Sequence, residues 1–154
     1  MGKFSGPLTK EYDALVNEGE IERAIELLSP YVVAGDPEAM YLRSLVFLRE
    51  DSEGAEGANL SLLQESAAKG YLPALFQLGM NHLVGDFFEQ NDQAAAAYFR
   101  QAAEGGLCSA EYEYGLALYH GRGVPRDVPA GLAMIRKAAS GGSYFAQEFV
   151  DSLS

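Results

Sequence analysis

The sequence predicts an all-α protein, a solenoid of antiparallel helix pairs, and three observations lead to this fold class. A turn element recurs at steps of 35 or 36 residues. Each period contains two stretches whose apolar residues follow helical spacing. Small residues recur at fixed positions within these stretches, as expected where packed helices approach closely. With 154 residues, 48% of them hydrophobic, the chain is long enough to bury the core of one such domain.

The turn element has the form Gly-x-x-x-Ala and occurs four times in the chain. An alanine pair, such as Ala102-Ala103, precedes every turn but the first. The regular spacing indicates a repeat protein. The four turns run from Gly35 to Ala39, from Gly70 to Ala74, from Gly106 to Ala110 and from Gly142 to Ala146.

The first helix of each repeat begins at the alanine of the turn, and we expect helices over 39–48, 74–83 and 110–119. A small residue stands five places after the opening alanine in all three: Ser44, Gly79 and Gly115. Glycine inside a helix costs about 1 kcal/mol relative to alanine. Its recurrence at one register therefore predicts a crowded helix crossing.

The second helix of each repeat is predicted from its capping residues. In the last repeat, Gly121 to Asp127 forms a loop that ends on an aspartate able to cap a helix over 128–140. Asn91-Asp92 offers the same cap to a helix over 94–104. In the earliest full repeat, an acidic loop over 50–57 is expected to precede a helix over 60–69.

The two ends of the chain are predicted to be helical as well. Residues 10–33 form a helix pair that turns at 17–20, and 146–153 form a final helix. A solenoid must cover its terminal hydrophobic surfaces, so such units are expected. The predicted organisation is one domain, 1–154, with an N-terminal pair (8–35), three repeats (36–70, 71–106 and 107–142) and a C-terminal capping helix (143–154).

The last full repeat contains an opening Ala110, the pair Tyr114-Gly115, the turn Gly121-Arg-Gly-Val124, Asp127 and a closing Lys137-Ala-Ala139. In these positions it closely resembles the Sel-one-like repeat, a relative of the tetratricopeptide repeat. The middle repeat departs at Phe87-Phe88, which replaces the glycine-valine pair, and the first full repeat is degenerate. The resemblance covers about two thirds of the chain, 36–142. It implies a right-handed, tetratricopeptide-like α-solenoid that acts as an adaptor or scaffold, without a shared catalytic residue set.

The resemblance also implies where a partner binds, because the first helices line the concave face of tetratricopeptide-like solenoids. The set obtained by position is rich in aromatic residues and suits an extended or helical peptide. Four of its members, Tyr41, Leu45, Phe76 and Leu116, are equally well explained as core residues. The full set is Tyr41, Leu45, Arg49, Phe76, Met80, Tyr112, Leu116, Tyr119 and His120.

The charge of the chain bears on the kind of partner. Asp and Glu number 22 against 11 Lys and Arg, so the protein repels phosphate backbones, and nucleic acid is not an expected partner. Residues 1–65 hold 13 of the acidic and 5 of the basic residues. Their acidic stretch is either a solvated face or a patch that steers a basic partner. Its members are Glu50, Asp51, Glu53 and Glu56, backed by Glu18, Glu20, Glu22 and Glu26.

No enzyme, cofactor or metal site is predicted. The chain has two histidines, His82 and His120, and the single cysteine Cys108, with no metal-ligand spacing or nucleophile-base pattern. No signal peptide or membrane-spanning run is apparent, so we expect a cytoplasmic protein without membrane insertion. Phe4, Phe145 and Phe149 either pair two copies or cap the ends, which leaves the oligomeric state open.

Two functional hypotheses follow. The leading one is a non-catalytic adaptor or scaffold, bacterial from its compact repeat style, that binds a peptide or domain of another protein. The alternative is an acidic inhibitor or immunity protein that neutralises a toxin or enzyme by direct binding.

Overall fold

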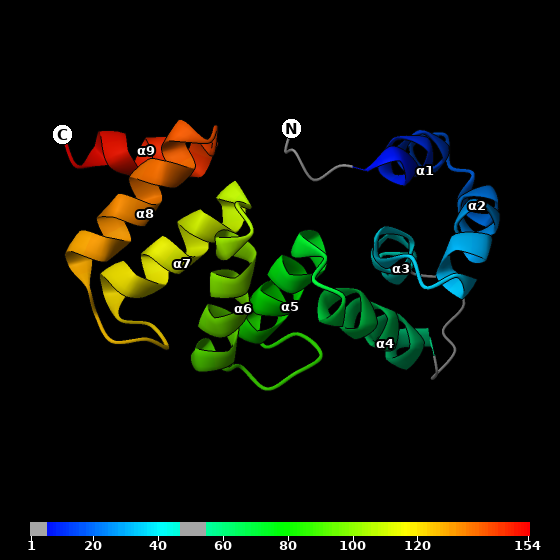
Figure 1. Ribbon diagram of the computed structural model, residues 1–154, viewed down its shortest axis with the longest axis horizontal. Coiled ribbons are helices and arrows are strands. Elements are labelled where there is room, and N and C mark those ends of the chain that lie inside the picture. Colours follow the sequence, from blue (N-terminus) through cyan, green and yellow to red (C-terminus); the bar gives the residue numbers. More distant parts are fainter. Residues whose placement is uncertain (1–5, 47–54) are drawn as a thin grey trace. The chain divides into compact units, whose positions relative to one another are not determined.

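The computed structural model describes residues 6–46 and 55–154 (Figure 1). Within these ranges the chain forms nine α-helices and no strand, which confirms the all-α prediction. The helices are α1 (Pro7–Asn17), α2 (Ile21–Val33), α3 (Pro37–Ser44), α4 (Ala55–Ala68), α5 (Leu72–Val84), α6 (Asp92–Glu104), α7 (Cys108–His120), α8 (Val128–Ser140) and α9 (Tyr144–Ser152).

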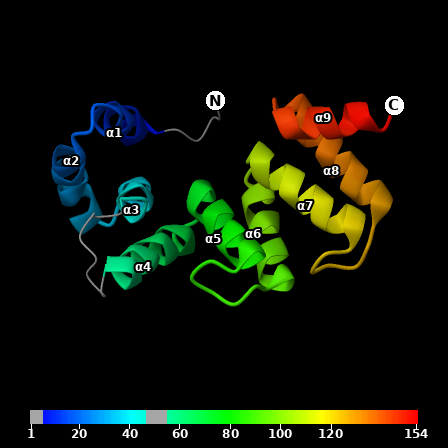
Figure 2. The same ribbon diagram turned by 180° about the vertical axis from the view of Figure 1, so that it is seen from behind.

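The helices fall into two compact units, Met1–Ala74 and Leu75–Ser154. The first unit holds α1 to α4 and the second holds α6 to α9, while α5 begins at the boundary and lies mostly in the second. In each unit successive helices pack against one another, for example α3 against α4 and α7 against α8 (Figures 1 and 2). The predicted order of first and second helices is therefore present in both units.

The four predicted turns share one backbone geometry. Their glycines, Gly35, Gly70, Gly106 and Gly142, all have φ between +80° and +96°, a left-handed conformation that glycine adopts without a steric penalty. Each of them follows a helix, which is where a left-handed residue reverses the chain. The alanine four residues later is fully buried in every turn. The glycine of the Gly-x-x-x-Ala element thus ends one helix, and its alanine anchors the start of the next helix in the core.

Polar caps start the helices that follow these turns and loops. The side chains of Asn91 and Asp127 accept hydrogen bonds from the backbone N–H groups of Ala94 and Ala130, at 2.9 and 3.0 Å. Both caps were predicted from the sequence and are confirmed. Asp36 and Ser143 cap α3 and α9 in the same way.

The predicted helix crossings are also confirmed. A Cβ atom added to Gly115 would lie 2.7 Å from the side chain of Ile135, and one added to Gly79 would lie 2.6 Å from the ring of Phe99. Gly131 of α8 faces α7 equally closely, since its Cβ would lie 2.7 Å from the carbonyl oxygen of Gly115. At this crossing α7 and α8 approach through glycine on both sides.

Two helix boundaries in the first full repeat differ from the prediction. α3 ends at Ser44, before the predicted end, because Leu45 and Val46 turn the chain with bonds to carbonyls three residues back. The buried Asn59 amide then donates to the carbonyl oxygen of Val46 at 3.2 Å. α4 begins at Ala55, so the predicted loop over 50–57 is helical at its end. The rest of that loop lies outside the described residues.

The loop of the middle repeat keeps the shape of the last one despite its different sequence. Phe87 has φ +60° at the position where the last repeat has Gly123, with φ +70°. Both loops close with an equivalent hydrogen bond. The Asn91 N–H donates to the carbonyl oxygen of His82 at 2.9 Å, and the Asp127 N–H donates to that of Leu118 at 2.8 Å. Loop closure therefore holds a phenylalanine in a conformation that favours glycine.

A buried carboxylate joins α1 to α3 in the first unit. Gly6, at the start of α1, offers no side-chain cap. Instead, Glu38 of α3 accepts hydrogen bonds from the backbone N–H and the hydroxyl of Thr9, at 2.9 and 2.6 Å. Burial, with the nearby Glu38 charge, raises the pKa of Tyr71 to about 12. The N-terminus of α1 is thus satisfied by a side chain from another helix.

Candidate partner-binding surface

The predicted binding residues of the first unit lie at the edge of its core. Tyr41 is half-buried, with its ring 5.5 Å from that of Tyr71, and burial raises the pKa of its hydroxyl. Leu45 is also half-buried, at the end of α3. Arg49 lies outside the described residues. Tyr41 therefore combines a packing contact with an exposed portion.

The equivalent residues of α5 have the same character. Phe76 and Met80 stand 35 residues after Tyr41 and Leu45, and both are half-buried. The ring of Phe76 lies tilted against the buried Phe99 of α6 at 5.6 Å. Phe76 is therefore held in place on one side and reaches solvent on the other.

On α7, Tyr112, Leu116 and Tyr119 lie on the side that faces α9. Tyr112 stacks on Phe145 at 6.4 Å, and Tyr119 meets the ring of Phe149 edge to face at 5.4 Å. Burial also raises the pKa of the Tyr112 hydroxyl. All three remain half-buried, whereas His120, beside Tyr119, is exposed.

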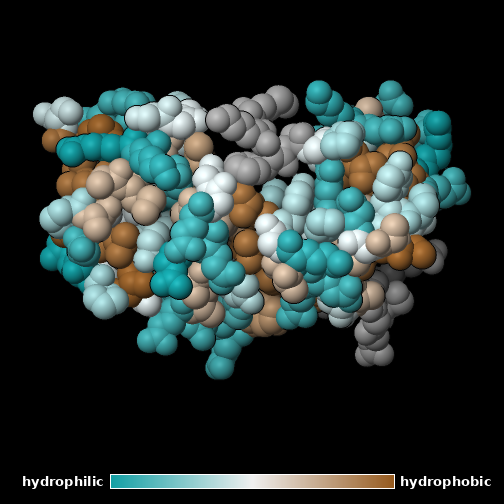
Figure 3. All heavy atoms as spheres, viewed as in Figure 1, coloured by the Kyte–Doolittle hydropathy of each residue, from teal (hydrophilic) through white to brown (hydrophobic). Residues whose placement is uncertain are grey.

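The two terminal phenylalanines predicted on α9 have different environments. Phe149 packs on the small core formed by Ile135, Ala138 and Ala146, as a capping residue does. Phe145 is 65% exposed. On the face of the second unit displayed in Figure 3, hydrophobic residues lie in groups between hydrophilic ones. Phe4 lies outside the described residues.

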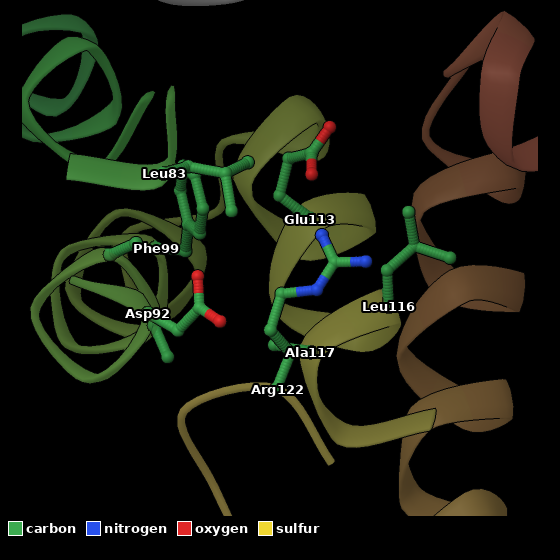
Figure 4. Close-up of a pocket in the computed structure, with 9 residues that line it drawn as sticks. Leu83, Asp92, Phe99, Glu113, Leu116, Ala117 and Arg122 are labelled. Carbon is green, nitrogen blue, oxygen red and sulfur yellow. The ribbon is translucent and has the colours of Figure 1, made fainter. Parts of the chain in front are cut away.

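A pocket opens in the second unit where α5, α6 and α7 meet. Of the predicted residues that the structure describes, only Leu116 lines it. The walls are otherwise apolar, and three charged residues complete the lining (Figure 4). The apolar residues are Leu83, Ala95, Ala96, Phe99, Leu116 and Ala117, and the charged ones are Asp92, Glu113 and Arg122.

The two carboxylates of the pocket are not fully balanced by positive charge or by hydrogen-bond donors. Burial raises the pKa of Glu113 above its ordinary value of 4.5, and the positive charge of Arg122 offsets this only in part. Within the described residues Glu113 makes no ion pair. The Oδ1 atom of Asp92 is buried and finds no hydrogen-bond partner among residues 6–46 and 55–154. Figure 4 shows Arg122 extending from the α7–α8 loop toward Glu113, with Asp92 on the opposite wall.

The charged pocket residues were not predicted. Leu83 could have been predicted, because it stands 36 residues before Tyr119 and so occupies the equivalent position of the preceding repeat. Glu113 follows Tyr112 directly and carried no signal of its own. Asp92 was interpreted as a cap, and Arg122 belongs to a loop whose path a repeat pattern does not define.

A second buried carboxylate in this unit, that of Glu111, has its charge balanced by a lysine. Glu111, with a side chain only 4% exposed, pairs with the Nζ atom of Lys137 at 2.6 Å. The hydrogen bond and charge of Glu111 raise the pKa of Lys137. The preceding repeat has the buried Leu75 at the position of Glu111. We therefore assign this pair to the α7–α8 contact and not to a binding site.

The remaining polar side chains discussed from the sequence make packing contacts. His82 stacks between the rings of Phe88 and Tyr98, at 4.3 and 5.7 Å. Cys108, at the start of α7, contacts the carbonyl oxygen of Gly141 at 3.4 Å. Across residues 6–46 and 55–154 no three His, Cys, Asp or Glu side chains gather as a metal site would require. No helix in that part of the chain is long and apolar enough to cross a bilayer.

The structure describes only part of the acidic stretch identified in the sequence. Glu50, Asp51 and Glu53, and the side chain of Glu56, lie outside the described residues. Glu18, Glu22 and Glu26 are exposed, and Glu20 forms an ion pair with Arg23. Its interpretation as a steering patch stays a prediction.

Comparison with known protein families identifies the repeats. The family model of the Sel1 repeat matches residues 72–107 and 108–143. Residues 72–143 carry two Sel1 repeats. The two matches begin at the first residues of α5 and α7, so each covers a first helix, a loop and a second helix. Sel1 repeats generally mediate protein–protein interactions and are typically non-catalytic scaffolds.

Solved structures of Sel1 repeat proteins share the fold. A Sel1 repeat protein from Oxalobacter formigenes is 24% identical, with a TM-score of 0.77, and the match covers 84% of this chain and 98% of that one. The protective antigen c5321 of uropathogenic Escherichia coli, which displays an SLR fold, is 25% identical, with a TM-score of 0.71 over 80% of this chain and 27% of the antigen. These likenesses confirm the predicted fold class, a helical-repeat solenoid related to the tetratricopeptide repeat.

Curated relatives match a shorter segment. The "DAP3-binding cell death enhancer 1" proteins of Rattus norvegicus and Mus musculus are each 44% identical over 59 residues. This match covers 35% of the present chain and only 12% of each relative. The shared part is therefore a small fraction of those proteins.

Proposed function

We propose that this Sel1 repeat chain is a non-catalytic interaction module that binds a peptide or domain of another protein along the first helices of its repeats. The supporting surface in the second unit consists of Phe76 and Met80 of α5 with Tyr112, Leu116 and Tyr119 of α7. Tyr41 and Leu45 offer the same chemistry on α3 of the first unit.

One observation carries this proposal: aromatic residues recur at one repeat position and stay partly exposed. Tyr41, Phe76 and Tyr112 are separated by 35 and 36 residues, and each is half-buried. Each ring also contacts a second ring, which limits its rotation. Preformed aromatic side chains bind a partner with little loss of conformational entropy. The net charge of −11 favours a basic partner protein over nucleic acid.

The test is an affinity purification of the tagged protein after crosslinking in its native cells, followed by calorimetry with the recovered partner. We expect Tyr112→Ala to weaken binding about tenfold or more, as interface aromatic residues do. Tyr144→Ala is the matched control, because Tyr144 is 73% exposed on α9 and outside the proposed surface. Failure to retain any protein would contradict the proposed function, and equal loss in both variants would contradict the proposed surface.

The acidity of the chain favours a second candidate, an inhibitor or immunity protein that covers the active site of a toxin or enzyme. A net charge of −11 suits a protein that must associate fast with a basic target. Here the recovered partner would be an enzyme, and one equivalent of this protein would abolish its activity. An adaptor would leave that activity unchanged.

A further inference from the structure

The loop that joins α5 to α6 carries a phenylalanine where the equivalent loop carries glycine. Phe87 has φ +60°, and Gly123 in the α7–α8 loop has φ +70°. We propose that Phe87 is a preformed anchor that inserts into an apolar pocket, rimmed by lysine or arginine, on a partner protein. This inference goes beyond the proposed function, because it concerns a loop and not the first helices of the repeats.

The backbone conformation of Phe87 is a cost that the loop could have avoided. In the left-handed region a Cβ atom crowds the following carbonyl oxygen, and glycine has no such penalty. A bulky residue is an outlier there. The path of the loop does not require the ring, because the α7–α8 loop closes with the same hydrogen bond over Gly123. Strained residues concentrate at binding sites, so this phenylalanine points to a role outside the loop.

Two apolar side chains of this region reach solvent. Phe87 is 43% exposed, and Val84, the last residue of α5, is 65% exposed. The loop extends beyond the end of α5 (Figure 1). In the α7–α8 loop no side chain fits at the equivalent position, since a Cβ atom on Gly123 would overlap the backbone of Asp92. The α5–α6 loop therefore presents an apolar ring that the other loop cannot present.

The loop is held in one conformation before a partner arrives. The Asn91 N–H donates to the carbonyl oxygen of His82 at 2.9 Å and closes the loop. Phe88, the residue after Phe87, stacks on the imidazole ring of His82 at 4.3 Å. An aromatic side chain on a fixed backbone loses little conformational entropy when it is buried by a partner.

Acidic side chains flank the phenylalanine and indicate the charge of the partner. Asp86 and Glu89 are exposed, and neither forms an ion pair in the part of the chain that the structure describes. The α7–α8 loop has the opposite charge, with Arg122 at the position of Asp86. A pocket that receives Phe87 therefore needs basic groups at its rim, and such a rim would repel the other loop.

Two other occupants fit less well. An anionic lipid surface would accept Phe87 and Val84 but would repel Asp86 and Glu89. A second copy of this chain would bring its own net charge of −11 to an acidic loop. A protein pocket with an apolar floor and a basic rim is favourable for both the ring and the carboxylates.

The first experiment locates the contact with a photoreactive residue. Phe87→p-benzoylphenylalanine and, separately, Tyr112→p-benzoylphenylalanine are made in the full chain, expressed in its native cells and irradiated. We expect the variant at Phe87 to crosslink to apolar residues of a partner that stand beside lysine or arginine. Tyr31→p-benzoylphenylalanine is the matched control, because Tyr31 is also 43% exposed but lies on α2 of the first unit.

The crosslinks separate this inference from the proposed function. A product from the variant at Tyr112 without one from the variant at Phe87 would overturn the anchor and leave the proposed function intact. A product at Phe87 without one at Tyr112 would support the anchor and contradict the proposed surface of the first helices. A product at Phe87 that joins a segment without lysine or arginine would overturn the proposed chemistry of the partner.

The second experiment titrates the crosslinked partner domain into the variants by calorimetry. Phe87→Gly and Phe87→Ala should each weaken binding about tenfold or more, as the loss of an aromatic anchor does. Asp86→Arg, which copies the charge of the equivalent loop position, should weaken binding more than Glu11→Arg does. Glu11 is exposed on α1, so its variant makes the same change in net charge elsewhere. Wild-type affinity in Phe87→Gly would overturn the proposal.

Thermal unfolding of the same two variants separates binding from folding. Phe87→Gly and Phe87→Ala both remove the ring, but only alanine keeps a Cβ atom in the left-handed conformation. We expect the glycine variant to melt at a higher temperature than the alanine variant. Equal losses of affinity at different melting temperatures would show that the ring, and not stability, is what the partner needs. The reverse order of melting would overturn the strain on which the proposal rests.

Discussion

The pair Glu111–Lys137 shows how a single residue changes the stability of a repeat. Removing Lys137 leaves a buried carboxylate without compensation, whereas Glu111→Leu restores the residue that the preceding repeat has at Leu75. Replacing a buried ion pair by a hydrophobic residue is often neutral, and breaking it is not. We expect Lys137→Met to lower the melting temperature more than Glu111→Leu does.

The same pair predicts a dependence on alkaline pH. The pKa of Lys137 is raised above 10.5 in the folded chain, so its contribution is complete below that pH and is lost as the pH rises through the folded pKa. The difference in stability between the wild type and Lys137→Met should shrink above about pH 10.5. Urea unfolding of both proteins at pH 7 to 11 measures this, and a constant difference would contradict the assignment.

Glu113 also predicts a loss of stability with rising pH, but in the acidic range and relieved by its neutral variant. Its pKa is raised in the folded state, so the wild type loses stability as the pH rises from the ordinary value of 4.5 through the folded pKa. Glu113→Gln lacks this titration. Its stability advantage over the wild type should therefore grow across that window and stay constant above it. Thermal unfolding of both proteins at pH 4 to 8 tests this, and a difference that stays constant across that range would contradict the prediction.

At the scale of helices, the α7–α8 crossing makes glycine necessary. Gly115→Ala places a methyl group against Ile135, and we expect a loss of about 1–3 kcal/mol in the free energy of unfolding. Gly57 in α4 is a matched control, because an added Cβ there meets nothing within 4 Å. Gly57→Ala should stabilise the protein by about 0.5–1 kcal/mol. Denaturant unfolding distinguishes them, and a gain in both variants would mean that the crossing is not crowded.

The attachment of α1 depends on a residue of α3. Glu38→Ala removes both hydrogen bonds to Thr9, which should cost about 1–3 kcal/mol. The loss should be local, because the N-terminus of α1 loses its acceptor while α7 and α8 keep theirs. Hydrogen exchange should accelerate in residues 7–17 and not in 108–140. Glu22→Ala, at an exposed position of α2, is the control, and unchanged protection of α1 in Glu38→Ala would contradict the capping role.

Most of the fold was predictable from the sequence because the repeat imposes local rules. Gly35 and Asp127 each act within a few residues of themselves, through a left-handed turn or a cap, and Ala39 is a buried position that recurs with the repeat. The early end of α3 was not predictable, because Leu45 and Val46 continue the apolar pattern of the sequence although their N–H groups bond to carbonyls three residues back, and because Asn59, which binds the Val46 carbonyl, comes from the following helix. The pocket was missed for the same reason, since Asp92 and Arg122 come together only through the packing of α6 against α7.

At the scale of the whole molecule, the net charge predicts how a partner is found. With a net charge of −11, association with a basic partner should slow as salt rises from 50 to about 500 mM, because the screening length falls well below 10 Å. Dissociation should change less, since short-range contacts dominate it. Stopped-flow mixing measures both rates. An association rate that is insensitive to salt would show that the acidic residues only keep the protein in solution.

The loop that holds Phe87 has a consequence for how such chains diversify. One hydrogen bond closes each loop, from Asn91 to His82 and from Asp127 to Leu118, and the backbone follows the same path over phenylalanine and over glycine. The shape of the loop is thus encoded mainly at its two ends. Phe87 shows that residues between those ends can differ, but Gly123 is constrained, because an added Cβ there would overlap the Asp92 backbone at the start of α6. New specificities can therefore evolve in these loops at least cost to folding where a position does not pack against a helix.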